Sequence, residues 1–244
     1  MLKPLAIAAL ASLTLLSATA HAETAHVAIT QIVEHPALDS VRKGVQDELA
    51  AHGYTAGQNL TWTYESAQGN VATAAQIARK FAGASPNVIV AIATPSAQTM
   101  VAAARNTPVI FSAVTDPLAA KLVTNMEKPG GNVTGITDML PLERHIELML
   151  RIKPDAKRIG TVYNPGEANA AALVEQLEAA LKPRGITLIR AAATRTSEVL
   201  GAARSLVGKV DLIYLTTDNT VISAAEAVIS VGEQARIPVM AADT

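Results

Sequence analysis

Short polar segments that follow apolar runs carry most of the side chains able to do chemistry in this sequence. The segment Thr94-Pro95-Ser96-Ala97-Gln98 directly follows the apolar run 88–93. Thr94 can cap a helix and Pro95 suits the first helical position, so the next backbone N–H groups stay free. Free N–H groups at a helix N-terminus attract anions. The segment therefore predicts a carboxylate site, with an ordinary helix cap as the alternative.

Two aspartates stand in further polar segments of this kind, Asp116 within Ser112–Pro117 and Asp218 within Thr216–Thr220. A carboxylate can hold a ligand ammonium by charge-assisted hydrogen bonds, which are stronger than neutral ones. The alternative role for each aspartate is a helix cap or a turn residue. We therefore predict that a ligand ammonium lies near Asp116 or Asp218.

A fourth polar, turn-forming segment is Tyr163-Asn164-Pro165-Gly166-Glu167-Ala168-Asn169. Tyr163 is a candidate stacking partner for an aromatic ligand, and a packed core tyrosine is the alternative. Each segment alone fits an ordinary turn. Four of them at equivalent strand ends favour one shared ligand site, because in an open parallel sheet the ligand lies outside the carboxyl ends of the strands.

Signatures of enzymes are absent from the sequence. The five histidines, at positions 21, 26, 35, 52 and 145, show no metal-ligand spacing, and HExxH, Walker, GxGxxG and GxSxG motifs are missing. Ser96 and Ser112 have no evident base, so a Ser-His-Asp arrangement has no support. We expect no catalytic residue, no metal and no cofactor.

The elements that must position these segments alternate between short β-branched runs and longer Ala-rich stretches, which is typical of βαβ units around parallel sheets. A break at 138–141 divides the alternation into two consecutive α/β halves, so we predict Rossmann-like lobes at 23–138 and 139–244. The predicted strands are 26–31, 59–65, 88–93, 109–113, 133–137, 158–163, 187–191, 212–215 and 239–241. The predicted helices are 36–52, 71–82, 96–105, 118–125, 141–152, 167–184, 197–207 and 221–235.

The two ends of the chain suggest secretion and an incomplete second lobe. Residues 1–22 combine a basic start at Lys3, an apolar run and the small-x-small triplet Ala20-His21-Ala22, which predicts a signal peptide and a periplasmic mature protein. A membrane anchor is the alternative reading. The chain stops at Thr244 directly after a predicted strand, so we expect that its C-terminus is incomplete.

Composition limits the partners. Lys plus Arg is 20 and Asp plus Glu is 21, so no basic excess is present to neutralise phosphates, and aromatic residues make up only 3%. Nucleic acid is therefore excluded as an expected partner. The chain has no cysteine, which rules out disulfides and a lipid anchor on cysteine.

The polar segments together resemble one known family, the ABC-transporter substrate-binding proteins that include tryptophan- and phenylalanine-binding members and have the type I periplasmic-binding-protein fold. The resemblance covers nearly the whole mature chain. It implies two hinged lobes, a ligand between them, and delivery to a membrane permease with its ATPase. The segments that carry it are Glu34–Asp39, Thr94–Gln98, Ala113–Pro117, Asn132–Gly135, Tyr163–Asn169 and Thr217–Thr220.

We therefore expect a monomeric periplasmic receptor that binds an amino acid, with an aromatic one favoured. The ligand carboxylate would lie at the helix N-terminus that contains Ser96. An extracytoplasmic sensory module and a periplasmic hydrolase are the alternatives. The candidate ligand-binding residues are Glu34, His35, Thr94, Ser96, Ala97, Gln98, Ser112, Thr115, Asp116, Thr137, Tyr163, Asn164, Glu167, Asn169, Thr217, Asp218 and Asn219.

Overall fold

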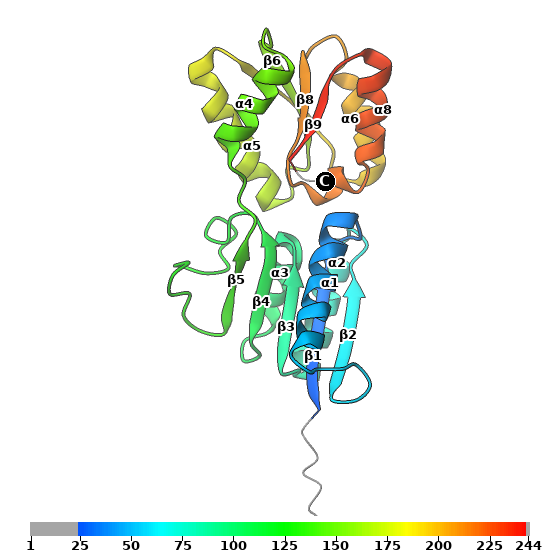
Figure 1. Cartoon of the computed structure of the whole chain (residues 1–244), viewed down its shortest axis with the longest axis vertical. Helices are drawn as coiled ribbons and strands as arrows, with labels where there is room; N and C mark the ends of the chain where they lie inside the picture. Colours follow the sequence, from blue (N-terminus) through cyan, green and yellow to red (C-terminus); the bar gives the residue numbers. More distant parts are fainter. Residues whose placement is uncertain (1–23, 243–244) are drawn as a thin grey trace, which may run out of the picture.

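The computed structural model describes residues 24–242, and within them the chain forms two parallel sheets that lie one after the other along the long axis (Figure 1). The predicted signal peptide lies outside the described residues. The predicted boundary after residue 138 falls between the two sheets and stays a prediction; we use it to name the N-terminal lobe (24–138) and the C-terminal lobe (139–242).

The N-terminal lobe contains a five-stranded sheet of order β2-β1-β3-β4-β5 with every pair parallel. The central strand β3 is a continuous apolar run whose last four residues are almost fully buried, as expected for a parallel sheet covered on both faces. Its strands are β1 (Ala25–Gln31), β2 (Leu60–Ser66), β3 (Val88–Ile92), β4 (Val109–Val114) and β5 (Val133–Thr137), and its helices are α1 (Pro36–Ala51), α2 (Val71–Ala84) and α3 (Thr94–Ala103).

The C-terminal lobe contains a four-stranded parallel sheet of order β7-β6-β8-β9. Its strands are β6 (Arg158–Tyr163), β7 (Thr187–Ala192), β8 (Leu212–Leu215) and β9 (Val239–Ala241). Its helices are α4 (Leu142–Ile152), α5 (Ala168–Leu181), α6 (Val199–Ser205), α7 (Asn219–Ile222) and α8 (Ala225–Ala235), with short 3₁₀ turns η1 (Lys182–Arg184) and η2 (Thr196–Glu198).

Both sheets direct the carboxyl ends of their strands toward the junction of the lobes (Figure 1). The loops that follow these strands therefore meet between the lobes. The α/β class with parallel sheets in two sets is confirmed. Among the described residues, no helix has the length and the apolar character needed to cross a membrane.

Three predicted helices differ from the structure. The helix predicted over 118–125 is wrong. The carboxylate of Asp116 accepts the N–H groups of Leu118 and Ala119 in a turn, and the left-handed φ of 59° at Lys121 prevents this turn from continuing as a right-handed helix. The helix predicted over 221–235 is two helices, since α7 ends at Ile222 and α8 begins at Ala225. The helix predicted over 197–207 is shortened to the turn η2 followed by α6.

Candidate functional site

A cavity of about 720 Å³ lies between the two lobes and is lined by loops from both sheets. The N-terminal lobe contributes the loop after β1, the first turns of α1, and the ends of β4 and β5. The C-terminal lobe contributes α5, the loop after β8, and the turn between α7 and α8. The lining residues are Glu34, His35, Pro36, Ala37, Leu38, Val41, Ser112, Ala113, Thr115, Ile136, Thr137, Asp138, Asn169, Thr217, Asp218, Asn219, Ile222, Ser223, Ala224, Ala225, Glu226 and Ile229.

The lining combines aliphatic side chains with a few polar groups, which is the usual composition of a small-molecule site. The aliphatic part comes from Leu38 and Val41 on one side and from Ile222 and Ile229 on the other. Of the residues that the structure describes, those lining the cavity include no lysine, arginine, phenylalanine, tyrosine or tryptophan. The cavity therefore offers apolar contact area together with carboxylate and amide groups.

Asp218 is the most deeply buried acid of the lining, with 0% exposure. One oxygen accepts the N–H of Asn164 at 2.5 Å and the other accepts the N–H of Val221 at 3.0 Å, so the residue caps α7. Burial in a low-dielectric site and the charge of nearby Glu167 raise the pKa of Asp218 to about 7. A group titrating this close to neutrality can exchange its proton when a ligand binds.

Glu167 lies close to Asp218 but does not line the cavity. Its carboxylate accepts hydrogen bonds from the backbone N–H groups and from the side chains of Asn219 and Thr220. It also accepts a hydrogen bond from the side-chain amide of Asn169 at 3.4 Å. Only 5% of the residue is exposed. Glu167, which we predicted as a ligand contact, therefore holds the loop after β8 against the start of α5.

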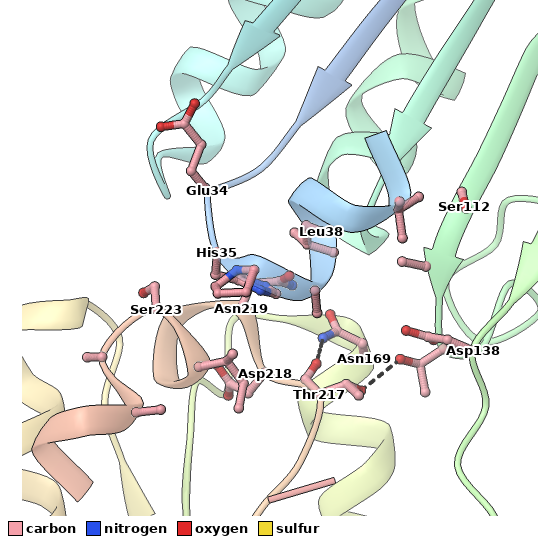
Figure 2. A pocket seen from close by; sticks show the side chains of 18 of the residues that line it. Glu34, His35, Leu38, Ser112, Asp138, Asn169, Thr217, Asp218, Asn219 and Ser223 are labelled. Atoms are coloured by element: carbon pink, nitrogen blue, oxygen red, sulfur yellow. Dashed lines mark hydrogen bonds between the residues drawn. The ribbon is translucent and has the colours of Figure 1, made fainter. Parts of the chain in front are cut away.

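Asn169 presents a free acceptor to the cavity. Its Nδ2 donates to the backbone oxygen of Thr217 at 2.7 Å, which turns Oδ1 upward beneath the first turn of α1 (Figure 2). The residue is 3% exposed and its Oδ1 atom has no hydrogen-bond partner. A buried acceptor without a donor costs free energy, so a donor supplied by a ligand would be favoured here.

The two lobes touch through a hydrogen bond across the cavity. Thr115, which follows β4, and Thr217, which follows β8, place their Oγ1 atoms 3.1 Å apart (Figure 2). Thr137, at the end of β5, donates its hydroxyl to the backbone oxygen of Thr115 at 2.8 Å and so supports the N-terminal side of this contact. The lobes are thus in contact at the floor of the cavity.

The backbone is strained where β3 and β4 end. Ala93 and Ala113 have φ values of 73° and 51°, in the left-handed region that side chains other than glycine rarely adopt. Such residues cost about 1–3 kcal/mol each and cluster at binding and catalytic sites. Ala113 lines the cavity, and the N–H of Ala93 bonds to the carbonyl of Ser112 next to it.

The structure brings nine of the seventeen predicted site residues to the cavity and leaves eight outside it, so strand-end position alone does not define the site. The nine are Glu34, His35, Ser112, Thr115, Thr137, Asn169, Thr217, Asp218 and Asn219. The eight are Thr94, Ser96, Ala97, Gln98, Asp116, Tyr163, Asn164 and Glu167. Whether any of the seventeen contacts a ligand stays a prediction.

The segment after β3 differs from its expected geometry. Ala93 and not Thr94 is the N-cap of α3, and no side chain caps that helix, so the predicted capping role of Thr94 is wrong. Thr94 and Ser96 are buried, and their hydroxyl oxygens have no partner within the described structure. Gln98 points to the loop after β4, where its amide donates to the backbone of Ala120.

The sequence interpretation missed the aliphatic part of the lining and the acids Asp138 and Glu226. Leu38 and Val41 carry a helical apolar pattern that reads as core. Ile222 and Glu226 lie at the turn between α7 and α8, which we had predicted as the interior of one helix. Only the break in that helix opens this turn to the cavity.

No group of three or more His, Cys, Asp or Glu side chains within residues 24–242 is arranged to hold a metal ion.

Two α/β lobes with a cavity between their strand ends define the class of two-lobed ligand-binding proteins. The sequence model of the family described as ABC transporter substrate binding protein matches residues 26–244, and the chain belongs to this family. The type I periplasmic-binding-protein fold and the predicted family membership are both confirmed.

Three relatives are similar over most of the chain. A tyrosine-binding protein of Clostridioides difficile is 39% identical over 218 residues, which are 89% of this chain and 63% of the relative; the chain thus spans less than two thirds of that relative's length. A Vibrio cholerae conserved domain protein is 51% identical, with a TM-score of 0.89 over 91% of this chain and 75% of the other. A Streptococcus pneumonia ABC domain solved in complex with L-Trp is 34% identical, with a TM-score of 0.85 over 89% and 74%.

Proposed function

We propose that this protein is the periplasmic receptor of an ABC importer and binds an aromatic amino acid in the cavity between its lobes. The observation that carries the proposal is one cavity lined by polar strand-end loops from both sheets. The names of the relatives support the ligand class, since one is a tyrosine-binding protein and another was solved with L-Trp. A permease and its ATPase would receive the ligand, and residues 1–22 would direct secretion.

The proposed ligand lies with its ammonium toward the C-terminal lobe and its carboxylate toward the N-terminal lobe. Asp218 is the proposed partner of the ammonium. For the carboxylate, two helix N-termini are available, and the first turn of α1 lines the cavity whereas that of α3 does not. His35 precedes α1 without capping it through its side chain, so the first N–H groups of α1 are left for an anion.

Calorimetric titration with the twenty amino acids, a sugar and a nucleoside tests this proposal. We expect heat of binding from at least one of tyrosine, tryptophan and phenylalanine, because the aliphatic lining matches an aromatic ring in polarity. Binding of the sugar or the nucleoside, with no response to any aromatic amino acid, would refute the ligand assignment.

Closure of the lobes around the ligand gives a second test. Thr217→Val removes the hydrogen bond to Thr115 that joins the lobes. Because such a bond contributes about 0.5–1.5 kcal/mol, we expect affinity for the aromatic amino acid to fall by about three- to tenfold. Thr187→Val, at an exposed position of β7, is the matched control and should leave affinity unchanged. Equal affinities for the two variants would show that this contact does not support the bound form.

A further inference from the structure

Apart from His35, the ionisable side chains that line the cavity are all acids. Its acids are Glu34, Asp138, Asp218 and Glu226, and no lysine or arginine within the described part of the chain lines it. The carboxylate of Glu34 is stabilised by two residues that do not line the cavity: Arg42 forms an ion pair with it at 4.0 Å, and the hydroxyl of Tyr64 donates to it at 3.1 Å. Glu226 lies in the first turn of α8, where the helix dipole stabilises a carboxylate.

Asp218 caps the short helix α7 but has no side-chain donor or cationic partner in the described structure. Its two hydrogen bonds come from backbone N–H groups. The other titratable groups around it are Glu167 at the start of α5 and, across the cavity or beside it, Glu34, His35, Asp138 and Glu226. An ionised Asp218 would add a second buried negative charge beside Glu167, which is costly without a cation.

Asn169 adds a second acceptor at the same place. Its Oδ1 atom is buried, lacks a donor, and belongs to a residue whose amide bonds to Thr217, the neighbour of Asp218. A primary ammonium carries three N–H donors and a positive charge, and so it can satisfy the carboxylate and the amide oxygen together. The carboxylate of an amine-free acid is negatively charged and has no N–H or O–H donor.

We infer that the cavity recognises its ligand through a positively charged amine placed against Asp218 and the Oδ1 atom of Asn169, and that small carboxylates lacking an amine are rejected. This inference rests on the proposed function and names the group by which the site selects. The apolar lining contacts the aromatic ring, which is the same in an amino acid and in its amine-free analogue, so the lining does not discriminate between the two.

A proton exchange follows from the same geometry. In the ligand-free protein the pKa of Asp218 is about 7, so below neutrality a proton neutralises the group. The arriving ammonium supplies the positive charge instead and lowers that pKa, so the proton leaves. The ligand competes with the proton, and we expect the association constant to fall by up to about tenfold for each pH unit below 7 until the pKa of the complex is reached.

The experiment compares tyrosine, tryptophan and phenylalanine with their amine-free analogues and with tyramine, tryptamine and phenethylamine. We expect each amine-free acid to bind at least about 30-fold more weakly than its amino acid, because the buried charge of Asp218 then loses its partner. An amine-free acid that binds within about threefold of its amino acid overturns the inference and leaves the receptor function standing. Binding of the amines alone supports the inference and refutes the amino-acid assignment, and binding of none of the nine compounds overturns both.

Proton release is the second measurement. Titrations near pH 6 in buffers with different ionisation enthalpies should show that close to one proton is released per ligand bound, since Asp218 is mostly protonated there. His35 is the one histidine among the described residues that line the cavity. His35→Gln should therefore retain the release; its loss in this variant, or its absence in the unaltered protein, overturns the assignment to Asp218.

Discussion

Replacement of Asp218 by asparagine is expected to weaken binding of the aromatic amino acid by about 30-fold or more at pH 8. The substitution keeps the size of the side chain but removes the negative charge that the ligand ammonium meets in a fully buried position. Loss of one member of a buried charged pair costs about 2–5 kcal/mol, and about 1.4 kcal/mol corresponds to a factor of ten. Calorimetric titration of the two proteins measures the difference.

Asp116→Asn is the matched control. Asp116 belongs to the equivalent loop of the N-terminal lobe, does not line the cavity, and caps a turn that asparagine can also cap. We expect its affinity to stay within about threefold of the unaltered protein. A larger loss in Asp116→Asn than in Asp218→Asn would place the ammonium at the other aspartate.

The unaltered protein and Asp218→Asn are also expected to differ in stability, by an amount that depends on pH. Because the folded-state pKa of Asp218 is raised from 3.8 to about 7, the ligand-free native state holds a proton that the unfolded chain loses. Ionisation therefore destabilises the native protein increasingly as pH rises from about 4 to about 7, and by a constant amount above that range.

Asp218→Asn has no such group. We therefore expect its free energy of unfolding, relative to that of the unaltered protein, to rise across the same pH range. Urea unfolding of both ligand-free proteins at several pH values measures the difference, and a difference independent of pH would contradict the raised pKa.

Glu167→Ala is expected to lower the free energy of unfolding by about 3–5 kcal/mol, the cost of removing one partner from a buried charged network. The carboxylate accepts five hydrogen bonds from Asn169, Asn219 and Thr220, and these donors would be buried without an acceptor. Relief of repulsion with Asp218 offsets part of this loss. Urea unfolding at constant pH measures the change.

Glu175→Ala on the same helix is the control, because Glu175 is exposed and makes no side-chain hydrogen bond or ion pair in the described structure. We expect a change within about 0.5 kcal/mol for this variant. If Glu167→Ala destabilised no more than Glu175→Ala, Glu167 would not anchor the loop after β8, and a direct role toward the ligand would regain support.

Much of the fold was predictable because parallel sheets buried on both faces leave a strong local pattern. Strands β5, β6, β8 and β9 were predicted with the bounds that the structure has. Helix ends were less predictable, because side chains decide them. The left-handed Lys121 ends the turn where a helix was predicted over 118–125, and the helix expected over 221–235 is interrupted where Ser223 bonds back to the carbonyl of Thr220.

The site was predictable only in part, since strand-end position selects loops and not the residues within them. Asp116 and Asp218 occupy equivalent positions after β4 and β8, yet one caps an exposed turn and the other is buried in the cavity. Glu167 and Asn169 stand two residues apart, and only Asn169 reaches the cavity. The aliphatic residues Leu38, Ile136 and Ile229 carried no signal that separates a ligand pocket from a core.

The sequence by itself determined the α/β class with parallel sheets, because alternating hydrophobic runs and turn chemistry act between near neighbours in the chain. The family followed from the resemblance of the polar segments to known members. Only the tertiary structure decided which polar groups share the cavity. The contact between Thr115 and Thr217 joins residues about one hundred positions apart in the sequence. The Oδ1 atom of Asn169 is left without a donor because the Nδ2 atom of the same amide donates to the backbone oxygen of Thr217. Which polar groups line the cavity depends on how one lobe packs against the other, and no local sequence pattern determines that packing.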